Sequence, residues 1–350
     1  MSGTSFDGVD VSLVRTDGYN YLKEIHSTFL EYNDTERKLY KSSLFNNFLK
    51  AKEIIDLKHI LCIKKLLKQS GFNSKMVDVI GLHGQTFAHN PEEQWSWQYI
   101  NADRIAKNFK TKVISELRLK DINNGGEGAP LVPIFHKLLS NNLNDSYPLA
   151  ILNIGGITNV TIIESVTKFS GFDIGPGNGP LDSIIYDRLK LPIDLDGKIA
   201  EKGRPNLKIM NNIISKINKN NKSFSFDRNK LDNICRVAVK QLGTSNALAT
   251  LVSLICELVF LKINKFKTNK IILVGGGRKN KFLVRKLKKT FKNKSSVILA
   301  EELGWNGDSI EAQAFGYLAV RSLLGLNITF TQTTGTNFPI SGGVLYNVID

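Results

Sequence analysis

Apolar and polar residues alternate near the start of the chain with the two-residue period of a half-buried strand. After a turn-like opening, MSGTSFDG, the apolar residues Val9, Val11 and Leu13 alternate with Asp10 and Ser12. A glycine-rich turn that feeds a strand either joins two strands of a hairpin or points backbone N–H groups at a phosphate. Taken alone, the opening favours the hairpin, and the rest of the chain has to decide between the two uses.

Helical and strand patterns alternate along the rest of the chain. Residues 34–70 have helical periodicity, and Gly71 is placed to end that helix. The stretch VDVIGLHGQTFAHNP then reads as a short strand and a turn, and strands and helices alternate from there to PLVPIFHKLLS. From Tyr147 onward, LAILNIGGITNVTIIES, FSGFDIGPGNGPLDSIIYDRL and KIILVGGGRKNKFLVRKLKKTF each place a glycine turn after a strand. This alternation predicts an α/β fold with helix-covered sheets.

The length of the chain predicts two domains. At 350 residues it is long enough for two cores. We expect an N-terminal α/β domain over residues 1–146 and a C-terminal α/β domain over residues 147–350, with a cleft between them. The Lys- and Asn-rich region near 191–245 predicts a helical insertion at the surface of the second domain.

Composition is typical of a globular protein, with 42% hydrophobic residues. The N-terminal residues lack the basic and apolar regions of a secretory signal, and no apolar run reaches the roughly 20 residues of a membrane span. The most apolar stretch, ALATLVSLICELVFLKI, is interrupted by Glu257 and Lys262, so we expect a buried helix there. Cys62, Cys235 and Cys256 lack metal-site spacing, which favours reduced thiols in a cytoplasmic protein.

The formal net charge of +15 raises the hypothesis of a nucleic-acid partner. Much of the excess lies in one stretch, between Lys262 and Lys294, which contains 13 Lys or Arg residues and no acidic residue. Within it, Leu283, Leu287 and Phe291 recur at helical spacing, which places the basic side chains on a solvated face. No interleaved aromatic residues suggest base stacking. We therefore expect neither a nucleic acid nor a membrane as partner.

Four glycine-bearing turns each adjoin a predicted strand: SGTSFDG, NIGGITN, FDIGPGNG and LVGGGRKN. Ligands of open α/β sheets bind at the carboxyl ends of strands, where glycine lets the backbone approach a phosphate closely. None of the four turns matches the P-loop or the dinucleotide-binding fingerprint. Together they predict a phosphate cradle built from glycine turns in both halves of the chain.

A bound phosphate requires carboxylates that place Mg²⁺ and activate a nucleophile. Asp7, Asp173 and Glu311 are the candidates, and each has a structural alternative. Asp7 could be a plain turn residue, Asp173 a turn cap, and Glu311 the third residue of a helix capped by Asp308. Two histidines with apolar neighbourhoods are more typical of hydrogen-bonded core residues than of ligands: His83 and His136.

Seven stretches carry, in this order, a resemblance to one family: MSGTSFDGVDV, GLHGQTFAHNP, GGEGAPLVPIFH, LNIGGITNV, GFDIGPGNGPLD, LVGGGRKN and GDSIEAQAFGYLAVR. They run from residue 1 to about residue 325 and resemble anhydro-N-acetylmuramic acid kinase. The resemblance implies two ribonuclease-H-like domains of the actin, hexokinase and heat-shock-chaperone ATPase fold. It also implies a reaction of peptidoglycan recycling: ATP phosphorylates O6 of 1,6-anhydro-N-acetylmuramic acid while water opens the anhydro bridge at C1, giving N-acetylmuramic acid 6-phosphate and ADP.

The resemblance also implies a role for each matching residue. Asp173 would be the base that activates water, since a carboxylate beside an acetal-like carbon is what this step requires, and Glu311 is the second catalytic candidate. ATP, with Mg²⁺ placed by Asp7, would bind at Gly3, Thr4, Ser5, Phe6, Asp7, Gly8, Val9, Asp10, Gly155, Gly156, Gly275, Gly276 and Gly277. The sugar would bind at Gln85, Thr86, Arg118, Gly175, Pro176 and Asn178.

The chain departs from the family pattern in several places. The family has a short apolar strand before M-S-G-T-S, central to its first sheet, so we expect the natural protein to begin a few residues upstream of Met1. Where the family reads D-F-R-R-R-D, this chain has ELRLKD at residues 116–121, with one positive charge fewer on the expected substrate side. GGQGAP has become GGEGAP at Glu127, the Thr-Gly-Arg-Glu segment is not recognisable around KSFSFDRNK, and PISGGVLYNV matches only loosely.

The sequence leaves two other functions open: a kinase for a different sugar of the same superfamily, or a nucleotide-sensing regulator without turnover. A regulator would need a DNA-binding helix pair or zinc-binding cysteines, which the sequence does not show. A catalytically idle scaffold would have lost the carboxylates, and all three are present. The sequence leaves the oligomeric state open, a homodimer included.

Overall fold

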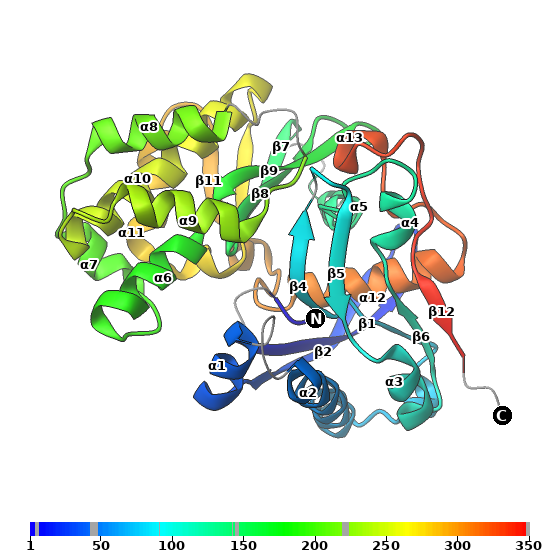
Figure 1. The fold of residues 1–350 in the computed structure, drawn as a ribbon. Helices are drawn as coiled ribbons and strands as arrows, with labels where there is room; N and C mark the ends of the chain where they lie inside the picture. Colours follow the sequence, from blue (N-terminus) through cyan, green and yellow to red (C-terminus); the bar gives the residue numbers. More distant parts are fainter. Residues whose placement is uncertain are drawn as a thin grey trace. The chain divides into compact units, whose positions relative to one another are not determined.

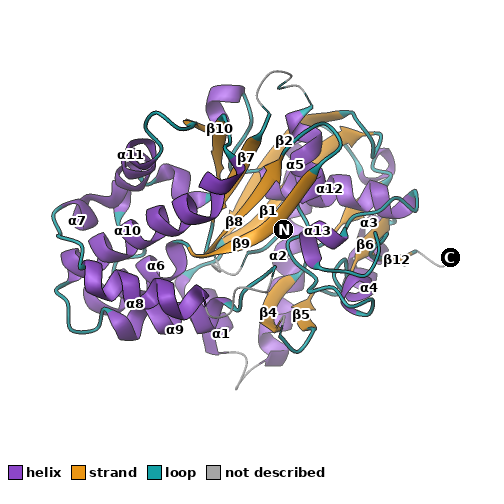
Figure 2. Ribbon diagram, turned by 90° about the horizontal axis from the view of Figure 1, so that it is seen from above, coloured by secondary structure: helices purple, strands orange, loops and turns teal. Residues whose placement is uncertain are grey.

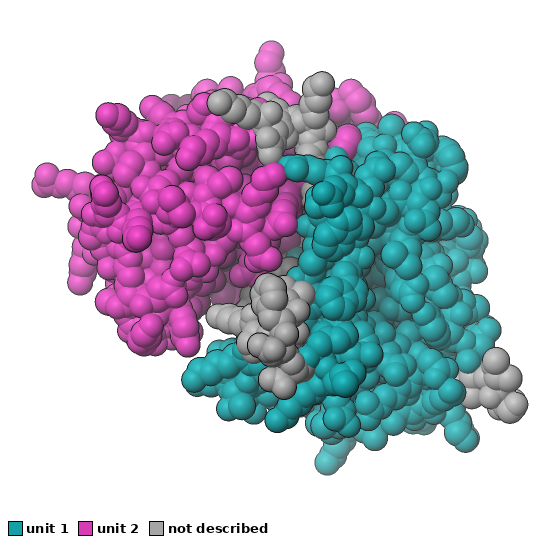
Figure 3. Space-filling model, in the orientation of Figure 1, with its two compact units in different colours: residues 1–139, 309–350 teal, residues 140–308 magenta. Residues whose placement is uncertain are grey.

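The computed structural model describes residues 1–3, 7–42, 48–90, 92–141, 143, 147–218 and 224–347 (Figure 1). Two compact units make up the chain (Figure 3): unit 1 comprises Met1–Leu139 and Ser309–Asp350, and unit 2 comprises Ser140–Asp308. This division differs from the expected one, which kept residues 147–350 together. The C-terminal residues belong to unit 1 because their helix packs on strands of that unit and their last strand pairs there.

Unit 2 is built around a five-stranded sheet with the order β11-β10-β7-β8-β9. Strand β8 is antiparallel to both of its neighbours, while β10 is parallel to β7 and to β11. This is the strand order of a ribonuclease-H-like domain. The elements of the unit are β7 (Leu149–Ile154), β8 (Ile157–Ile163), β9 (Phe169–Pro176), α6 (Asn178–Leu189), α7 (Lys198–Glu201), α8 (Leu207–Asn218), α9 (Arg228–Ala238), α10 (Thr244–Ile263), β10 (Lys270–Val274), α11 (Lys281–Thr290) and β11 (Ser296–Leu299).

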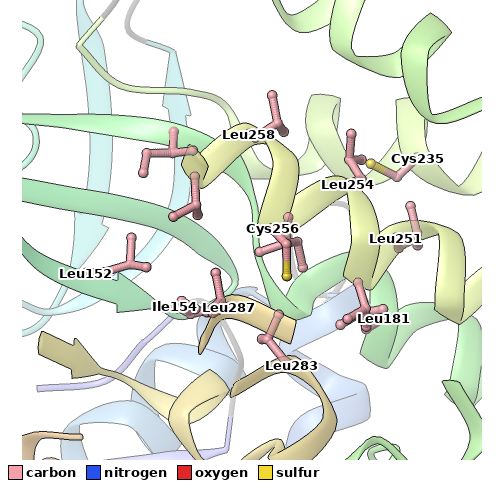
Figure 4. Packing of buried hydrophobic residues seen from close by; sticks show 14 of the residues in the cluster. Leu152, Ile154, Leu181, Cys235, Leu251, Leu254, Cys256, Leu258, Leu283 and Leu287 are labelled. Atoms are coloured by element: carbon pink, nitrogen blue, oxygen red, sulfur yellow. The ribbon is translucent and has the colours of Figure 1, made fainter. Parts of the chain in front are cut away.

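The core of unit 2 lies between this sheet and the helices that gather on one side of it (Figures 1 and 2). Figure 4 shows Leu152 and Ile154 of β7 facing α10 and α11, whose Leu254 and Leu287 are part of the same cluster. Helices α8 and α9, in the region expected to be a surface insertion, also contribute buried residues to this core.

Helix α10 is the central helix of this core. Its stretch Thr244–Phe266, which continues into a short 3₁₀ turn, is long and apolar enough to cross a membrane, but 67% of its most apolar window is buried inside the structure. The burial explains why the helix is apolar on nearly every face. The expectation of a buried helix is confirmed.

Unit 1 contains a hairpin, a three-stranded sheet and a second hairpin. Strands β1 and β2 are antiparallel, β6 lies between the parallel β3 and the antiparallel β12, and β4 pairs with β5. The elements are β1 (Gly8–Thr16), β2 (Leu22–Glu31), α1 (Asp34–Ser42), α2 (Phe48–Ser70), β3 (Val79–Gly81), β4 (Gln85–Asn90), β5 (Trp95–Tyr99), α3 (Ala102–Phe109), β6 (Lys112–Ser115), α4 (Leu119–Ile122), α5 (Pro133–Ser140), α12 (Ile310–Leu323), α13 (Thr331–Thr334) and β12 (Val344–Tyr346). The opening stretch precedes β1 and is not the loop of its hairpin.

A cavity of about 290 Å³ lies between β1 and β3. Residues 10–16 and 78–82 line it, together with side chains of α2 and α12. At one of its borders, the amino group of Met1 donates to the carbonyl oxygen of Asp10 at 2.8 Å, and the Asp10 N–H donates to the Met1 carbonyl oxygen at 2.9 Å. Among the described residues no strand pairs with both β1 and β3, so the β1–β2 hairpin and the β3–β6–β12 sheet remain separate.

We predict that Leu254→Ala destabilises unit 2, because the Leu254 side chain is fully buried and its truncation leaves a cavity in the core. The free energy of unfolding should fall by about 3 to 5 kcal/mol, the usual cost of this substitution at a buried leucine. Leu261→Ala is the matched control on the same helix, since Leu261 is 47% exposed, and should cost less than about 1 kcal/mol. Urea unfolding of the two variants measures the difference, and equal losses would contradict the assignment of the core.

Candidate active site

The first residues of the chain lie against the start of β4. Ser2 forms a parallel bridge with Gln85, and the Gln85 Nε2 group donates to the Gly3 carbonyl oxygen at 3.0 Å. Gln85 itself is completely buried. The structure therefore brings together two predicted site residues, Gly3 and Gln85, that are 82 positions apart in the chain.

The rest of the opening stretch contains packing residues as well as candidate ligand contacts. Val9 is completely buried in the core of unit 1, so its side chain is not available to a ligand. A Cβ atom at Gly8 would lie 2.4 Å from the Leu30 carbonyl oxygen, which makes glycine necessary there. Asp7 is exposed. The backbone N–H and carbonyl groups of Asp10 are hydrogen-bonded to Met1, as described above. Three predicted residues lie outside the described part of the chain: Thr4, Ser5 and Phe6.

A polar cluster lies at the carboxyl ends of β3 and β6. The Arg118 Nη2 group lies 2.9 Å from Nε2 of His83, and the His83 Nδ1 atom lies 2.8 Å from the Gly84 carbonyl oxygen. Gln85 and Thr86 are the next two residues in the chain after Gly84. The Gln85 Oε1 atom and the Thr86 Oγ1 atom are buried and have no hydrogen-bond partner among the described residues. Buried polar atoms are nearly always hydrogen-bonded, so these two oxygens are candidates for contact with a bound ligand.

The loop after Arg118 is held by a buried carboxylate. Asp121 is completely buried, and it accepts hydrogen bonds from the Gly128 N–H at 2.8 Å and from the Thr334 hydroxyl at 2.7 Å. A Cβ atom at Gly126 would lie 2.1 Å from the Asp121 Oδ2 atom, so the loop needs glycine there. Asp121 thus fixes the backbone that contains Glu127, one of the positions that depart from the family pattern.

In unit 2, the turn after β7 and the turn after β9 are bonded to each other through their backbones. The Asn178 N–H donates to the Gly155 carbonyl oxygen at 2.7 Å, and the Gly177 N–H donates to the Gly156 carbonyl oxygen at 3.1 Å. The Asn178 side chain also donates to the Ile154 carbonyl oxygen at 3.2 Å. The predicted residues of these two turns therefore form one group: Gly155, Gly156, Gly175, Pro176 and Asn178.

The third glycine turn of unit 2 follows β10 and packs against the end of β7. Gly275 has a φ of +75°, and a Cβ atom there would lie 2.1 Å from the Asn153 Oδ1 atom. A Cβ atom at Gly277 would lie 2.5 Å from the Ile154 side chain, whereas one at Gly276 would meet nothing closer than 3.6 Å. Because β7 and β10 are parallel neighbours, their turns meet at one edge of the sheet, as expected for a ligand site.

Asp173 lies within β9 and its carboxylate is held by the backbone of a distant segment. The side chain is 9% exposed, and its Oδ2 atom accepts a hydrogen bond from the Phe226 N–H at 2.9 Å. The Asp173 N–H in turn donates to the Phe224 carbonyl oxygen at 2.7 Å. Asp173 is thus fixed by residues 224–226, in the stretch whose family motif the sequence does not show.

Glu311 lies in the first turn of α12, but Asp308 does not cap this helix, so the structural alternative considered for Glu311 does not hold in that form. The N-cap residue is Ser309. The Asp308 carboxylate instead accepts hydrogen bonds from Arg278 at 2.8 Å and forms an ion pair with Lys279 at 2.7 Å. A charged partner binds a carboxylate more strongly than a helix N-terminus does, which explains the outcome.

The glycines of LVGGGRKN were predicted as site residues, but the arginine that follows them was not. Arg278 is 6% exposed, donates to Glu301 at 2.7 Å and to Asp308, and donates to the Gly275 carbonyl oxygen at 2.9 Å. It therefore holds the glycine turn in place. A charged residue directly after three glycines was the available signal.

Arg228 is a second residue that the sequence did not point to. A Cβ atom at Gly156 would lie 3.0 Å from the Arg228 Nε atom, and one at Gly179 would lie 3.3 Å from it. The guanidinium group of Arg228 therefore lies over the glycine turns of unit 2 and adds positive charge there. No sequence signal marked it, because KSFSFDRNK does not show the family motif.

A family model described as anhydro-N-acetylmuramic acid kinase matches residues 1–348 of the chain. The chain belongs to this family. It is 35% identical to the anhydro-N-acetylmuramic acid kinase of Pelagibacter ubique (strain HTCC1062), over 99% of this chain and 96% of that protein. It is 34% identical to the enzyme of that name from Zymomonas mobilis subsp. mobilis, over 99% of this chain and 98% of that protein.

Among solved structures, component A of the (R)-2-hydroxyglutaryl-CoA dehydratase from Acidaminococcus fermentans resembles the chain with a TM-score of 0.48. Its sequence identity is 10%, and the match covers 92% of this chain and 96% of that chain. The family expected from the sequence motifs and the α/β fold class are both confirmed, the first by the family match and the second by the sheets and helices of the two units.

The described residues contain no group of three or more His, Cys, Asp or Glu side chains that could hold a metal ion by themselves. Mg²⁺ usually takes only one or two carboxylates from the protein and the remaining ligands from phosphates and water. A single exposed carboxylate such as Asp7 fits a magnesium ion of that kind, bound together with a nucleotide.

We predict that unit 1 loses stability between pH 7 and pH 5.5. Burial lowers the pKa of His59, His89 and His136 to about 3, and burial together with the Arg118 charge holds the pKa of His83 well below 6.5. In the unfolded chain these histidines take up protons near pH 6.5, whereas in the folded chain they stay neutral. Acid therefore favours unfolding, by about 1 kcal/mol for each fully buried histidine over this interval.

Urea unfolding at several pH values measures this slope. His136→Gln is the informative variant, because His136 is almost completely buried and should contribute its full share of the slope. A free energy of unfolding that stays constant or rises as the pH falls from 7 to 5.5 would contradict the prediction.

Proposed function

We propose that the protein is an ATP-dependent kinase that opens 1,6-anhydro-N-acetylmuramic acid and phosphorylates its O6, giving N-acetylmuramic acid 6-phosphate and ADP. The observation that carries this proposal is the family match over residues 1–348, with relatives of this name that are 35% and 34% identical over nearly their whole length. The protein would act in the cytoplasm, on sugar released from peptidoglycan.

The glycine turns of unit 2 are suited to the phosphates of ATP. Their backbones meet at the carboxyl ends of β7 and β10, and Gly276 presents backbone without a side chain at that edge. Arg228 and the N-terminus of α6 add favourable charge for an anion there. In unit 1 we assign the backbone of residues 3–10 to the nucleotide as well. Mg²⁺, coordinated by Asp7 and by phosphate oxygens, would neutralise charge on the phosphates.

Asp173 is suited to the role of general base. In the proposed reaction, a water oxygen forms a bond to C1, the bond between C1 and O6 breaks, and O6 takes the γ-phosphoryl group of ATP. The proton lost by the water goes to the Asp173 carboxylate. The hydrogen bond from the Phe226 N–H to Oδ2 fixes the orientation of this carboxylate, which is what a positioned base requires.

Each unit contains polar groups that we assign to the sugar. In unit 1 the side chains of Gln85, Thr86 and Arg118 offer hydrogen-bonding groups, and the buried oxygens of Gln85 and Thr86 call for partners. In unit 2 we assign residues 175–178 to the sugar, with Glu311 of unit 1 as the second catalytic candidate after Asp173.

We predict that Asp173→Asn lowers kcat by roughly 10² to 10⁴, the usual contribution of a general base, while ATP still binds. The asparagine keeps the size and the hydrogen bond from Phe226 but accepts no proton. Asp182→Asn, nine positions further on and within α6, is the matched control and should cost far less. Steady-state kinetics with the anhydro sugar and ATP binding by calorimetry give the two readouts.

Water labelled with ¹⁸O adds an independent check on the reaction itself. The wild-type product should carry the label at C1, which hydrolytic opening demands and simple phosphorylation of a hydroxyl does not. Near-normal turnover of Asp173→Asn would refute the role of Asp173, and product without label would refute the hydrolytic step.

We predict that alanine substitutions at two neighbouring glycines of the third turn affect different properties. Gly276→Ala should fold normally, since its Cβ meets nothing closer than 3.6 Å, but should weaken ATP binding roughly tenfold, about the effect of one lost hydrogen bond to a charged group. Gly277→Ala should destabilise unit 2, because its Cβ would lie 2.5 Å from Ile154. Melting temperature and ATP affinity separate the two effects, and normal ATP affinity of a folded Gly276→Ala would contradict the assignment.

A further inference from the structure

The contact between His83 and Arg118 joins two segments at one edge of a sheet. His83 follows β3 and Arg118 follows β6, and these two strands are parallel neighbours. The carboxyl ends of parallel strands are where α/β proteins bind their ligands. Both residues belong to unit 1, and the hydrogen bond between them spans 35 positions of the chain.

The two hydrogen bonds of the His83 ring fix its tautomer. A carbonyl oxygen only accepts hydrogen bonds, so the Nδ1 atom 2.8 Å from the Gly84 carbonyl oxygen carries the proton. A guanidinium group only donates, so the Nε2 atom 2.9 Å from Arg118 is the acceptor. Both ring nitrogens are thus engaged, and the ring packs against Phe315 at a centroid distance of 4.8 Å.

The surroundings of His83 keep the ring neutral. Burial lowers the pKa of His83 well below 6.5, and the positive charge of Arg118 lowers it further. Only the neutral ring can accept from Arg118, so burial and the hydrogen bond act together. A neutral histidine with both nitrogens occupied is suited neither to proton transfer nor to metal binding. It is suited to holding the guanidinium group.

A second observation points to a ligand beside this pair. The buried Oε1 atom of Gln85 and the buried Oγ1 atom of Thr86, two and three positions after His83, have no hydrogen-bond partner in the described part of the chain. Both side chains are more than nine-tenths buried. Their polar atoms call for a partner that a bound sugar, with its hydroxyl and amide groups, can supply.

We propose that His83 is a positioning residue, which orients the Arg118 guanidinium group for the carboxylate of the muramic acid. This inference rests on the proposed function, because it takes the muramic acid as the ligand. A muramic acid carries a carboxylate on its lactyl ether, and a guanidinium group binds a carboxylate best through two parallel hydrogen bonds in one plane. The His83 bond engages one of the five N–H donors of Arg118 and fixes that plane.

A purely structural role of His83 makes a different prediction. If the ring only supported the loop before β4, its loss would lower stability and would affect sugar binding with or without Arg118. If it acts through Arg118, its effect on sugar binding depends on that residue. The two roles are therefore separated by a double-mutant cycle.

The experiment measures kcat and KM for 1,6-anhydro-N-acetylmuramic acid, and KM for ATP, with the full-length chain. The variants are His83→Leu, which accepts no hydrogen bond, and His83→Gln, whose amide oxygen can still accept one. Each is also combined with Arg118→Met. His136→Leu is the control, because His136 is also buried but lies on α5. KM does not depend on the folded fraction, so a poorly folding variant remains informative.

We expect His83→Leu to raise the KM for the sugar roughly tenfold, the effect of a lost hydrogen bond that involves a charged group, with kcat within about threefold of the wild type. His83→Gln should restore most of the affinity, and His136→Leu should leave the KM for the sugar and for ATP unchanged. In the Arg118→Met background, His83→Leu should have no further effect on the KM for the sugar.

An unchanged KM in His83→Leu would overturn the inference while leaving the proposed function intact, and so would effects of the two substitutions on KM that multiply. A wild-type protein that does not turn over this sugar would refute the proposed function instead.

Discussion

The candidate site of unit 2 depends on glycine backbone packed directly against neighbouring atoms at the end of the sheet. A Cβ atom at Gly177 would lie 2.3 Å from the Gly155 carbonyl oxygen, and one at Gly275 would lie 2.1 Å from the Asn153 side chain. These distances leave no room for any side chain. The turns after β7, β9 and β10 can therefore meet only as glycine turns, and the edge that they form presents backbone N–H and carbonyl groups beside the Arg228 side chain.

The rest of unit 2 holds these turns in place. Strand β7 is buried along its whole length and fixes the positions of its neighbours β8 and β10. Arg278 binds the carbonyl oxygen of Gly275 and is itself held by Glu301 and Asp308. Burying a guanidinium group without partners would destabilise the fold by several kcal/mol. Arg278 can therefore anchor the glycine turn only because the carboxylates of Glu301 and Asp308 bind it. The cradle is thus fixed by hydrogen bonds and by burial together.

The sequence predicted the parts of the structure that are encoded locally. Glycine spacing located the turns of unit 2, and the apolar composition of α10 predicted a buried helix, because both properties depend on residues that are close in the chain. Contacts between distant segments were missed. The ion pairs of Asp308 with Arg278, the position of Arg228 over Gly156 and the return of α12 to unit 1 all depend on tertiary packing, which no periodicity shows. The roles proposed for the site residues remain predictions.

The two units differ in how they would recognise a ligand. The turns of unit 2 offer backbone groups, whose positions tolerate few substitutions because of the close glycine contacts. The polar cluster of unit 1 offers side-chain groups instead, from Gln85 and from Arg118, which is held by His83. The departures of this chain at residues 116–121 and at Glu127 fall in unit 1, within the loop held by Asp121. On the proposed function, phosphate binding by the glycine turns would therefore be the invariant part of the chemistry. A difference in sugar preference between this chain and its relatives would arise in these side chains of unit 1, or in the departing stretch of unit 2 that holds Asp173.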